Sequence, residues 1–68
     1  MSYKVTKFDA EGRKVAELGN RPTVTAARNL MIEDANGYEP NTPPFHCPEL
    51  KIVEGWFIGS TEYNIELV

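Results

Sequence analysis

The feature that most limits how this chain can fold is a proline-rich segment in its middle. Four of the five prolines lie within residues 36–48, namely Pro40, Pro43, Pro44 and Pro48. Proline lacks a backbone N–H donor and has a fixed φ, so neither a helix nor a central strand can run through this segment. We therefore expect a long loop here, stiffened by its prolines, between two regions of regular structure.

The first region is expected to begin with a β-hairpin. Residues 3–8 and 13–18 are rich in strand formers, and residues 9–12 between them, Asp-Ala-Glu-Gly, are typical of a turn. The pattern breaks at residues 19–22, where we expect the second strand to end.

A helix is expected next, beginning near Thr25, whose hydroxyl can cap the first turn. Apolar side chains then recur at helical spacing, and Asn36-Gly37 is a typical C-terminal stop. Glu33 and Asp34 fall in the last turn, where the helix dipole disfavours negative charge by about 0.3–1 kcal/mol each. They either bind a cationic group or are simply tolerated, and we favour the second reading.

After the proline-rich segment the sequence is strand-like to its end. Residues 50–53 and 56–58 flank Glu54-Gly55, which is either a tight turn or a bulge, and residues 63–68 alternate between apolar and polar side chains. The predicted fold class is therefore α+β, a small two-layer domain with one helix packed on one face of an antiparallel sheet. The predicted order is ββαββ, or ββαβββ if Glu54-Gly55 is a hairpin turn.

The spacing of apolar residues also predicts which side chains form the core. At least two of Phe45, Trp56 and Phe57 are expected to be buried, because so small a domain needs its large apolar side chains inside. The other expected core residues are Tyr3, Val5, Val15, Leu18, Val24, Ala27, Leu30, Met31, Ile52, Ile58, Ile65 and Leu67.

The chain is 68 residues long, and we expect a single domain over residues 1–68. Its lone cysteine, Cys47, excludes an internal disulfide, whereas a secreted chain of this size is expected to carry several. No apolar run approaches the roughly 20 residues of a membrane span, and the N-terminus lacks the apolar region of a signal peptide. We therefore predict a cytoplasmic protein that does not enter a membrane.

The sequence predicts no catalytic, cofactor-binding or metal-binding residues. His46 and Cys47 are the only candidate base and nucleophile, but neighbouring side chains in an extended segment point to opposite sides. One His, one Cys and scattered carboxylates show no metal-ligand spacing, and there is no phosphate-binding loop. We therefore expect the protein not to be an enzyme.

Charge is distributed unevenly along the chain. Residues 1–32 carry six basic and three acidic side chains, a net charge of +3, whereas residues 33–68 carry one basic and seven acidic side chains, a net charge of −6. Such asymmetry indicates a charged partner, unless the two sets of charges intermix once the sheet has folded.

The favoured function is a non-enzymatic protein-binding module, an inhibitor or adaptor that acts on a basic partner surface. Aromatic side chains on a rigid loop make good anchors for a partner. In size, acidity and element order the chain resembles the short acidic accessory proteins of phages and mobile elements, which often act by binding, and that resemblance carries over no residue. The predicted contact residues are Glu33, Asp34, Tyr38, Glu39, Phe45 and His46.

Two alternatives stay open at this point. The first hairpin carries Lys4, Lys7, Arg13 and Lys14 close to aromatic side chains, a combination suited to nucleic acid, although the overall charge of −3 argues against it. The other alternative is a homodimer in which a sheet edge or an exposed aromatic face pairs with itself.

Overall fold

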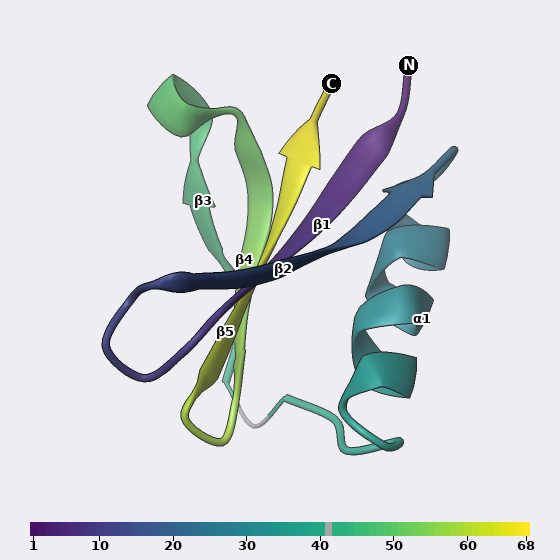
Figure 1. Cartoon of the computed structure of the whole chain (residues 1–68). Coiled ribbons are helices and arrows are strands. Elements are labelled where there is room, and N and C mark those ends of the chain that lie inside the picture. Colours follow the sequence, from purple (N-terminus) through teal and green to yellow (C-terminus); the bar gives the residue numbers. More distant parts are fainter. Residues whose placement is uncertain (41) are drawn as a thin grey trace.

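A five-stranded antiparallel sheet with one helix on one face makes up the fold (Figure 1). The computed structural model describes residues 1–40 and 42–68. The strands follow the order β2-β1-β5-β4-β3, so the predicted α+β class is confirmed with the order ββαβββ. The elements are β1 (Tyr3–Phe8), β2 (Lys14–Arg21), α1 (Val24–Asp34), β3 (Phe45–Cys47), the 3-10 helix η1 (Pro48–Leu50), β4 (Ile52–Ile58) and β5 (Thr61–Leu67).

The first hairpin forms as predicted, but its second strand is longer than expected. Asp9 stabilises the turn by accepting hydrogen bonds from two backbone N–H groups within it. β2 does not stop before Gly19 but continues to Arg21. Gly19 has a φ of +137° and lies at a shift in the pairing with β1, so it absorbs the irregularity that would otherwise end the strand.

The helix α1 is capped by a different threonine from the one predicted. The Thr23 hydroxyl accepts a hydrogen bond from the Ala26 N–H at 3.1 Å, so Thr23 is the N-cap and Thr25 lies inside the first turn. At the other end Asn36 and Gly37 both have positive φ, and they terminate α1 as expected.

The proline-rich segment holds a strand that was not expected. Three residues lie between Pro44 and Pro48. All three have backbone N–H groups, and they form β3 at the edge of the sheet. The expectation that no central strand passes through the segment is therefore confirmed, whereas the reading of the whole segment as a loop is wrong. Glu54-Gly55 lies inside β4 and is not a hairpin turn, and the strand has a bulge between Ile52 and Glu54.

The core lies between α1 and the sheet. Its fully buried residues are Val5, Ala27, Met31, Tyr63 and Ile65. Seven apolar side chains pack partly buried against this cluster: Tyr3, Leu18, Leu30, Ile32, Ala35, Trp56 and Ile58. The predicted core is thus confirmed at its centre, and Ile52 is also buried, while Val24 and Leu67 are half-buried.

Three predicted core side chains are exposed. Val15 is 56% exposed, and it lies at a register shift on the outermost strand. Phe45 and Phe57 are 36% and 45% exposed, so only Trp56 of the three candidate aromatics packs against the core. The reason is alternation along β4, which points Trp56 and Phe57 to opposite faces of a sheet that has a helix on one face alone.

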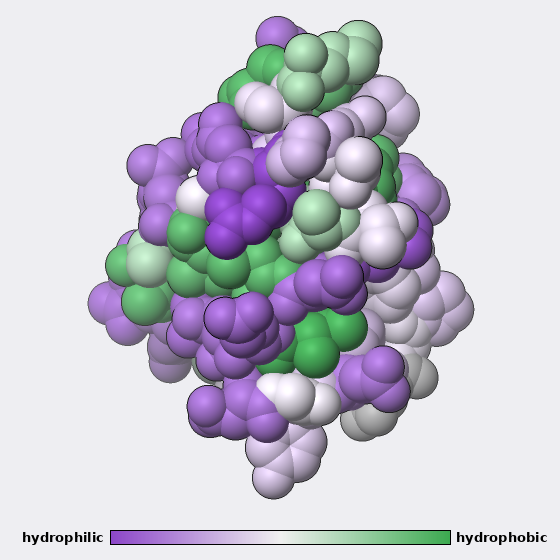
Figure 2. Space-filling view, turned by 90° about the vertical axis from the view of Figure 1, so that its right-hand side faces the viewer, coloured by the Kyte–Doolittle hydropathy of each residue, from purple (hydrophilic) through white to green (hydrophobic). Residues whose placement is uncertain are grey.

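The surface over the helix is largely hydrophilic. Figure 2 shows this side of the molecule, on which apolar patches appear between polar side chains.

No helix among the described residues is long and apolar enough to cross a bilayer, and α1 has 11 residues.

Candidate functional site

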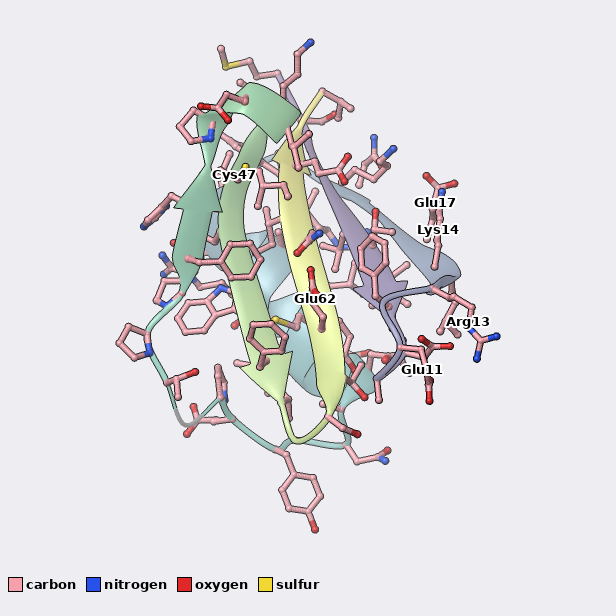
Figure 3. All side chains as sticks on the ribbon, turned by 90° about the vertical axis from the view of Figure 1, so that its left-hand side faces the viewer. Glu11, Arg13, Lys14, Glu17, Cys47 and Glu62 are labelled. Atoms are coloured by element: carbon pink, nitrogen blue, oxygen red, sulfur yellow. The ribbon has the colours of Figure 1, made fainter. Side chains whose placement is uncertain are left out.

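Figure 3 looks directly onto the face of the sheet opposite α1, on which residues 1–40 and 42–68 form no second layer. Tyr63 and Glu54 bond to residues of α1, so the residues beside them in β5 and β4 point to the opposite side. We call this side the open face. It consists of three rows of directly paired residues: Asn20, Lys4, Glu66, Ile52 and Cys47; Glu17, Thr6, Asn64, Gly55 and Phe45; and Lys14, Phe8, Glu62 and Phe57.

An exposed pair of phenylalanines lies at one side of the open face. The rings of Phe45 and Phe57 have centroids 5.8 Å apart and are tilted by 37°. The Phe45 ring lies directly over Gly55, its partner on β4, so closely that a Cβ at Gly55 would be 2.1 Å from the ring. The glycine is thus covered by an aromatic ring, and the ring is held on the sheet because the glycine leaves room for it.

Most charges of the open face neutralise one another. Lys4 Nζ lies 3.1 Å from Glu17 and 3.7 Å from Glu66, and Lys14 lies 3.5 Å from Glu17. The hydrogen bond with Glu17 raises the pKa of Lys4, and the same bond lowers the pKa of Glu17. Lys4, Lys14, Glu17 and Glu66 therefore form a network of ion pairs on the β2 side of the open face.

Glu62 stands apart from this network. It is labelled near the middle of the face in Figure 3, and it forms no ion pair with any residue that the structure describes. Its direct partners across the sheet are Phe8 on β1 and Phe57 on β4. A carboxylate without a counter-charge therefore lies between two aromatic side chains.

Two polar side chains next to this row each bury an oxygen for which the described residues supply no hydrogen-bond partner. Thr6 is 2% exposed and Asn64 is 5% exposed, and they pair directly with each other on the two central strands. Thr6 Oγ1 and Asn64 Oδ1 have no hydrogen-bond partner among the described residues. Leaving such a group unsatisfied typically costs about 1–3 kcal/mol.

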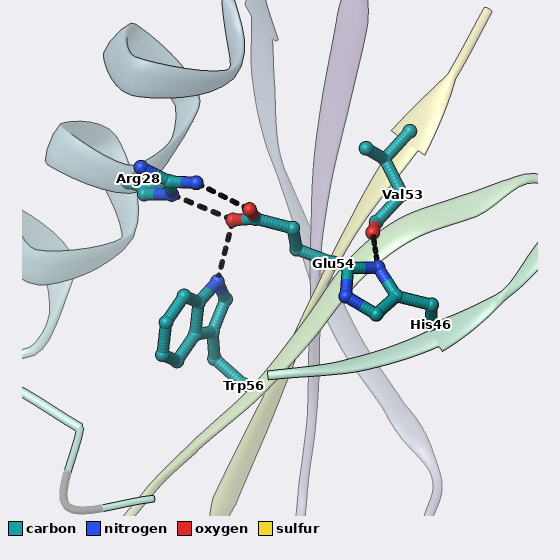
Figure 4. A network of polar contacts seen from close by, with 5 residues as sticks. All are labelled: Arg28, His46, Val53, Glu54 and Trp56. Atoms are coloured by element: carbon teal, nitrogen blue, oxygen red, sulfur yellow. Dashed lines mark hydrogen bonds and ion pairs between the residues drawn. The ribbon is translucent and has the colours of Figure 1, made fainter. Parts of the chain in front are cut away.

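On the other side of the sheet, Glu54 ties β4 to the helix (Figure 4). The Arg28 guanidinium donates two hydrogen bonds to the Glu54 carboxylate, and the Trp56 indole N–H donates another at 3.0 Å. Arg28 holds the pKa of Glu54 below its usual value despite burial, which acts in the opposite direction. Arg28 and Trp56 thus both bond to the Glu54 carboxylate, which is the arrangement expected of a contact that holds the helix against the sheet.

A hollow of about 470 Å³ opens where α1 ends. Asp34 lines it, pairs with Lys7 Nζ at 2.9 Å and accepts a hydrogen bond from the Tyr63 hydroxyl at 2.8 Å. Lys7 lowers the pKa of Asp34, and burial with the Asp34 contact raises the pKa of Tyr63 to about 12. Tyr38, 72% exposed, and Glu39 also line the hollow.

The structure divides the six predicted contact residues between separate places. Asp34, Tyr38 and Glu39 meet at the hollow, with Glu33 exposed on α1 beside them. The other two lie on β3, where Phe45 belongs to the open face. His46 is exposed, and its ring contacts the Val53 carbonyl oxygen (Figure 4).

The charges of the two halves of the chain intermix in part. Lys4, Lys7 and Arg28 pair with Glu66, Asp34 and Glu54, all of which follow residue 32. Asp34, one of the predicted contact residues, is therefore already paired with Lys7 within the chain. Glu33, Glu39, Glu49 and Glu62 have no ion pair within residues 1–40 and 42–68.

Sequence reasoning missed the open face, although it contained a usable signal. The predicted alternation placed Tyr63, Ile65 and Leu67 on one side of the last strand, which assigns Glu62, Asn64 and Glu66 to the other. The pairing that brings Phe8 and Phe57 beside Glu62 joins strands far apart in the sequence, and no local pattern reports it. Within the described part of the chain, there is no group of three or more His, Cys, Asp or Glu side chains that could hold a metal ion.

Comparison with known proteins adds no further assignment. The sequence matches no protein-family model, and no curated protein or solved structure is significantly similar to it.

Proposed function

We propose that this chain is a non-enzymatic protein-binding module that docks a basic partner surface on its open face. The observation that carries the proposal is the exposed Phe45–Phe57 pair. The Phe45 ring is held on the sheet because it packs directly over Gly55. Exposed aromatic side chains that are already fixed in place lose little entropy on association, which makes them effective anchors.

The charge of the open face favours a basic partner. Lys4 and Lys14 are already paired with Glu17 and Glu66, so Glu62 beside the phenylalanines is the charge left for an incoming group. A partner surface with Lys or Arg side chains around an apolar centre complements this arrangement.

The same ion pairs weigh against nucleic acid as the ligand. Lys4, Lys7, Arg13 and Lys14 of the first hairpin are each within 4 Å of a carboxylate, and Lys7 contacts α1 and not the open face. Phosphate binding needs cations that are free to replace counterions.

Selection of binding peptides tests the proposal. A random peptide library displayed on phage is selected against the full chain, and the binders are measured against a Phe45→Ser/Phe57→Ser double variant. We expect selected peptides to be rich in Lys or Arg with apolar residues, and to bind the double variant at least about tenfold more weakly.

Leu50→Ser is the matched control, because Leu50 is 66% exposed and lies in η1, outside the open face. Equal binding to wild type and to a correctly folded double variant would overturn the proposal. So would sub-micromolar affinity for single- or double-stranded nucleic acid at about 150 mM salt, where phosphate contacts are already weakened.

A further inference from the structure

We propose that Phe8, Glu62 and Phe57 form a binding site for one arginine side chain of the partner. The inference rests on the proposed function, since it names the group that the open face would recognise. Glu62 pairs directly with Phe8 on one neighbouring strand and with Phe57 on the other. Adjacent strands are roughly 4.8 Å apart, so Glu62 has an aromatic residue at about that spacing on each side.

The site has the chemistry of a cation receptor. Aromatic faces attract cations through the ring quadrupole, and a carboxylate adds a direct counter-charge. Lys4 and Lys14, the cations of the open face, lie against Glu17, and no described residue supplies a cation to Glu62. A cation that neutralises Glu62 would therefore come from a partner.

Arginine fits the surrounding atoms better than lysine does. Asn64 follows Glu62 by two positions on the same face of β5, about 7 Å along the strand, and Thr6 is its partner on β1. Both side chains are buried, and Asn64 Oδ1 and Thr6 Oγ1 have no partner among the described residues, so neither oxygen is open to an incoming group. Arginine therefore suits Glu62 and the rings themselves: its guanidinium offers several N–H donors to one carboxylate and a plane that stacks on an aromatic face.

A titration of the wild-type chain tests this site without any substitution. Nα-acetyl-arginine methylamide is added at constant ionic strength while aromatic carbon–proton correlation spectra are recorded. We expect saturable shifts at the Phe8 and Phe57 rings. The citrulline analogue, which keeps the shape and lacks the charge, should bind at least about threefold more weakly, and the lysine analogue should also be weaker.

Glu62→Gln should lower the affinity for the arginine probe by about threefold or more. Glu66→Gln is the matched control, since Glu66 lies on the same strand and face but already pairs with Lys4. The control should bind the probe as wild type does.

Equal affinity for arginine and citrulline, or shifts confined to residues outside the open face, would overturn the inference. A dimer in sedimentation equilibrium whose formation shifts the Phe8 and Phe57 rings would overturn it too, because a second copy would then cover the face. Failure of the arginine site is distinguishable from failure of the proposed function. If selected peptides need Phe45 and Phe57 but bind Glu62→Gln unchanged, the docking face stands and the arginine site is wrong.

Discussion

Asp34 carries a negative charge at the end of a helix, where the dipole disfavours it, yet the fold supplies it with a cation. Lys7 and the Tyr63 hydroxyl both contact its carboxylate, so the reading that the charge is simply tolerated is wrong for this residue. Glu54 is a second partnered acid, held by Arg28 and Trp56. In both residues the partner lowers the pKa of the carboxyl group in the folded state.

These lowered pKa values predict that the protein loses stability in acid. A carboxyl whose pKa is lower in the folded than in the unfolded state stabilises the fold above its unfolded pKa, and that contribution is lost as the pH falls through the folded pKa. The ordinary values are 3.8 for Asp34 and 4.5 for Glu54. We therefore expect the free energy of unfolding to be level from about pH 5 to 7 and to fall below about pH 4.5.

Urea unfolding followed by circular dichroism across this pH range measures the effect. Glu54→Gln should make the acid slope shallower, because it removes one of the carboxyl groups whose pKa is lowered in the folded state. Glu49→Gln, at an exposed acid in η1, should leave the slope unchanged. Identical acid slopes in all three proteins would contradict the assignment of Glu54.

The two threonines at the start of α1 give a second prediction at the same scale. Thr23→Ala removes the hydrogen bond to the Ala26 N–H and should lower the free energy of unfolding by about 0.5–2 kcal/mol. Thr25→Ala leaves the cap intact and places a better helix former in the first turn, so it should be neutral or slightly stabilising. Equal losses in the two variants, measured by urea unfolding, would show that Thr23 is not the cap.

At the scale of elements, the helix and four of the five strands could be predicted from local pattern, because each is long enough to show its period. β3 could not, since it has only three residues between Pro44 and Pro48 and is stabilised by pairing with β4. The helix cap was misplaced for a similar reason. Thr23 and Thr25 are equally good caps in sequence, and only the structure shows that Thr23 has the extended backbone of an N-cap, with φ −135° and ψ 158°.

Gly55 shows how β3 and β4 depend on each other. Its φ is not in the left-handed region, so Gly55→Ala strains no backbone, but its Cβ would collide with the Phe45 ring. We expect Gly55→Ala to displace the ring and to lower the free energy of unfolding by about 1–3 kcal/mol.

The same substitution in a Phe45→Ala background is the control. Without the ring, alanine at position 55 should be neutral or stabilising, because glycine weakens a strand by about 0.5–1 kcal/mol relative to alanine. The double-mutant cycle in urea would then show strong coupling. If Gly55→Ala has the same cost in both backgrounds, the ring does not depend on the glycine.

At the scale of the whole molecule, the candidate site was less predictable than the fold. Open-face residues such as Glu62 belong to rows that cross four or five strands, and each row joins residues from both ends of the chain. Alternation gives the face of each residue within its own strand, but the strand order β2-β1-β5-β4-β3 decides which residues become neighbours. The predicted contact residues were chosen by nearness in sequence, and the fold separates them.

The small size of the core makes stability sensitive to any one of its side chains. Five residues are fully buried between α1 and the sheet, and one core of this size supplies only about 3–5 kcal/mol of net stability. Met31 is 1% exposed, and Met31→Ala should cost about 2–5 kcal/mol, because it removes buried apolar atoms and leaves a cavity between α1 and the sheet. In a domain of this length, that loss should lower the Tm by at least about 8 °C or leave the chain unfolded at room temperature. Leu50→Ala is the matched control, since Leu50 is 66% exposed and should change stability by no more than about 0.5 kcal/mol. A thermal melt of Met31→Ala that superimposes on that of Leu50→Ala would mean that α1 contributes its apolar face to something other than this core.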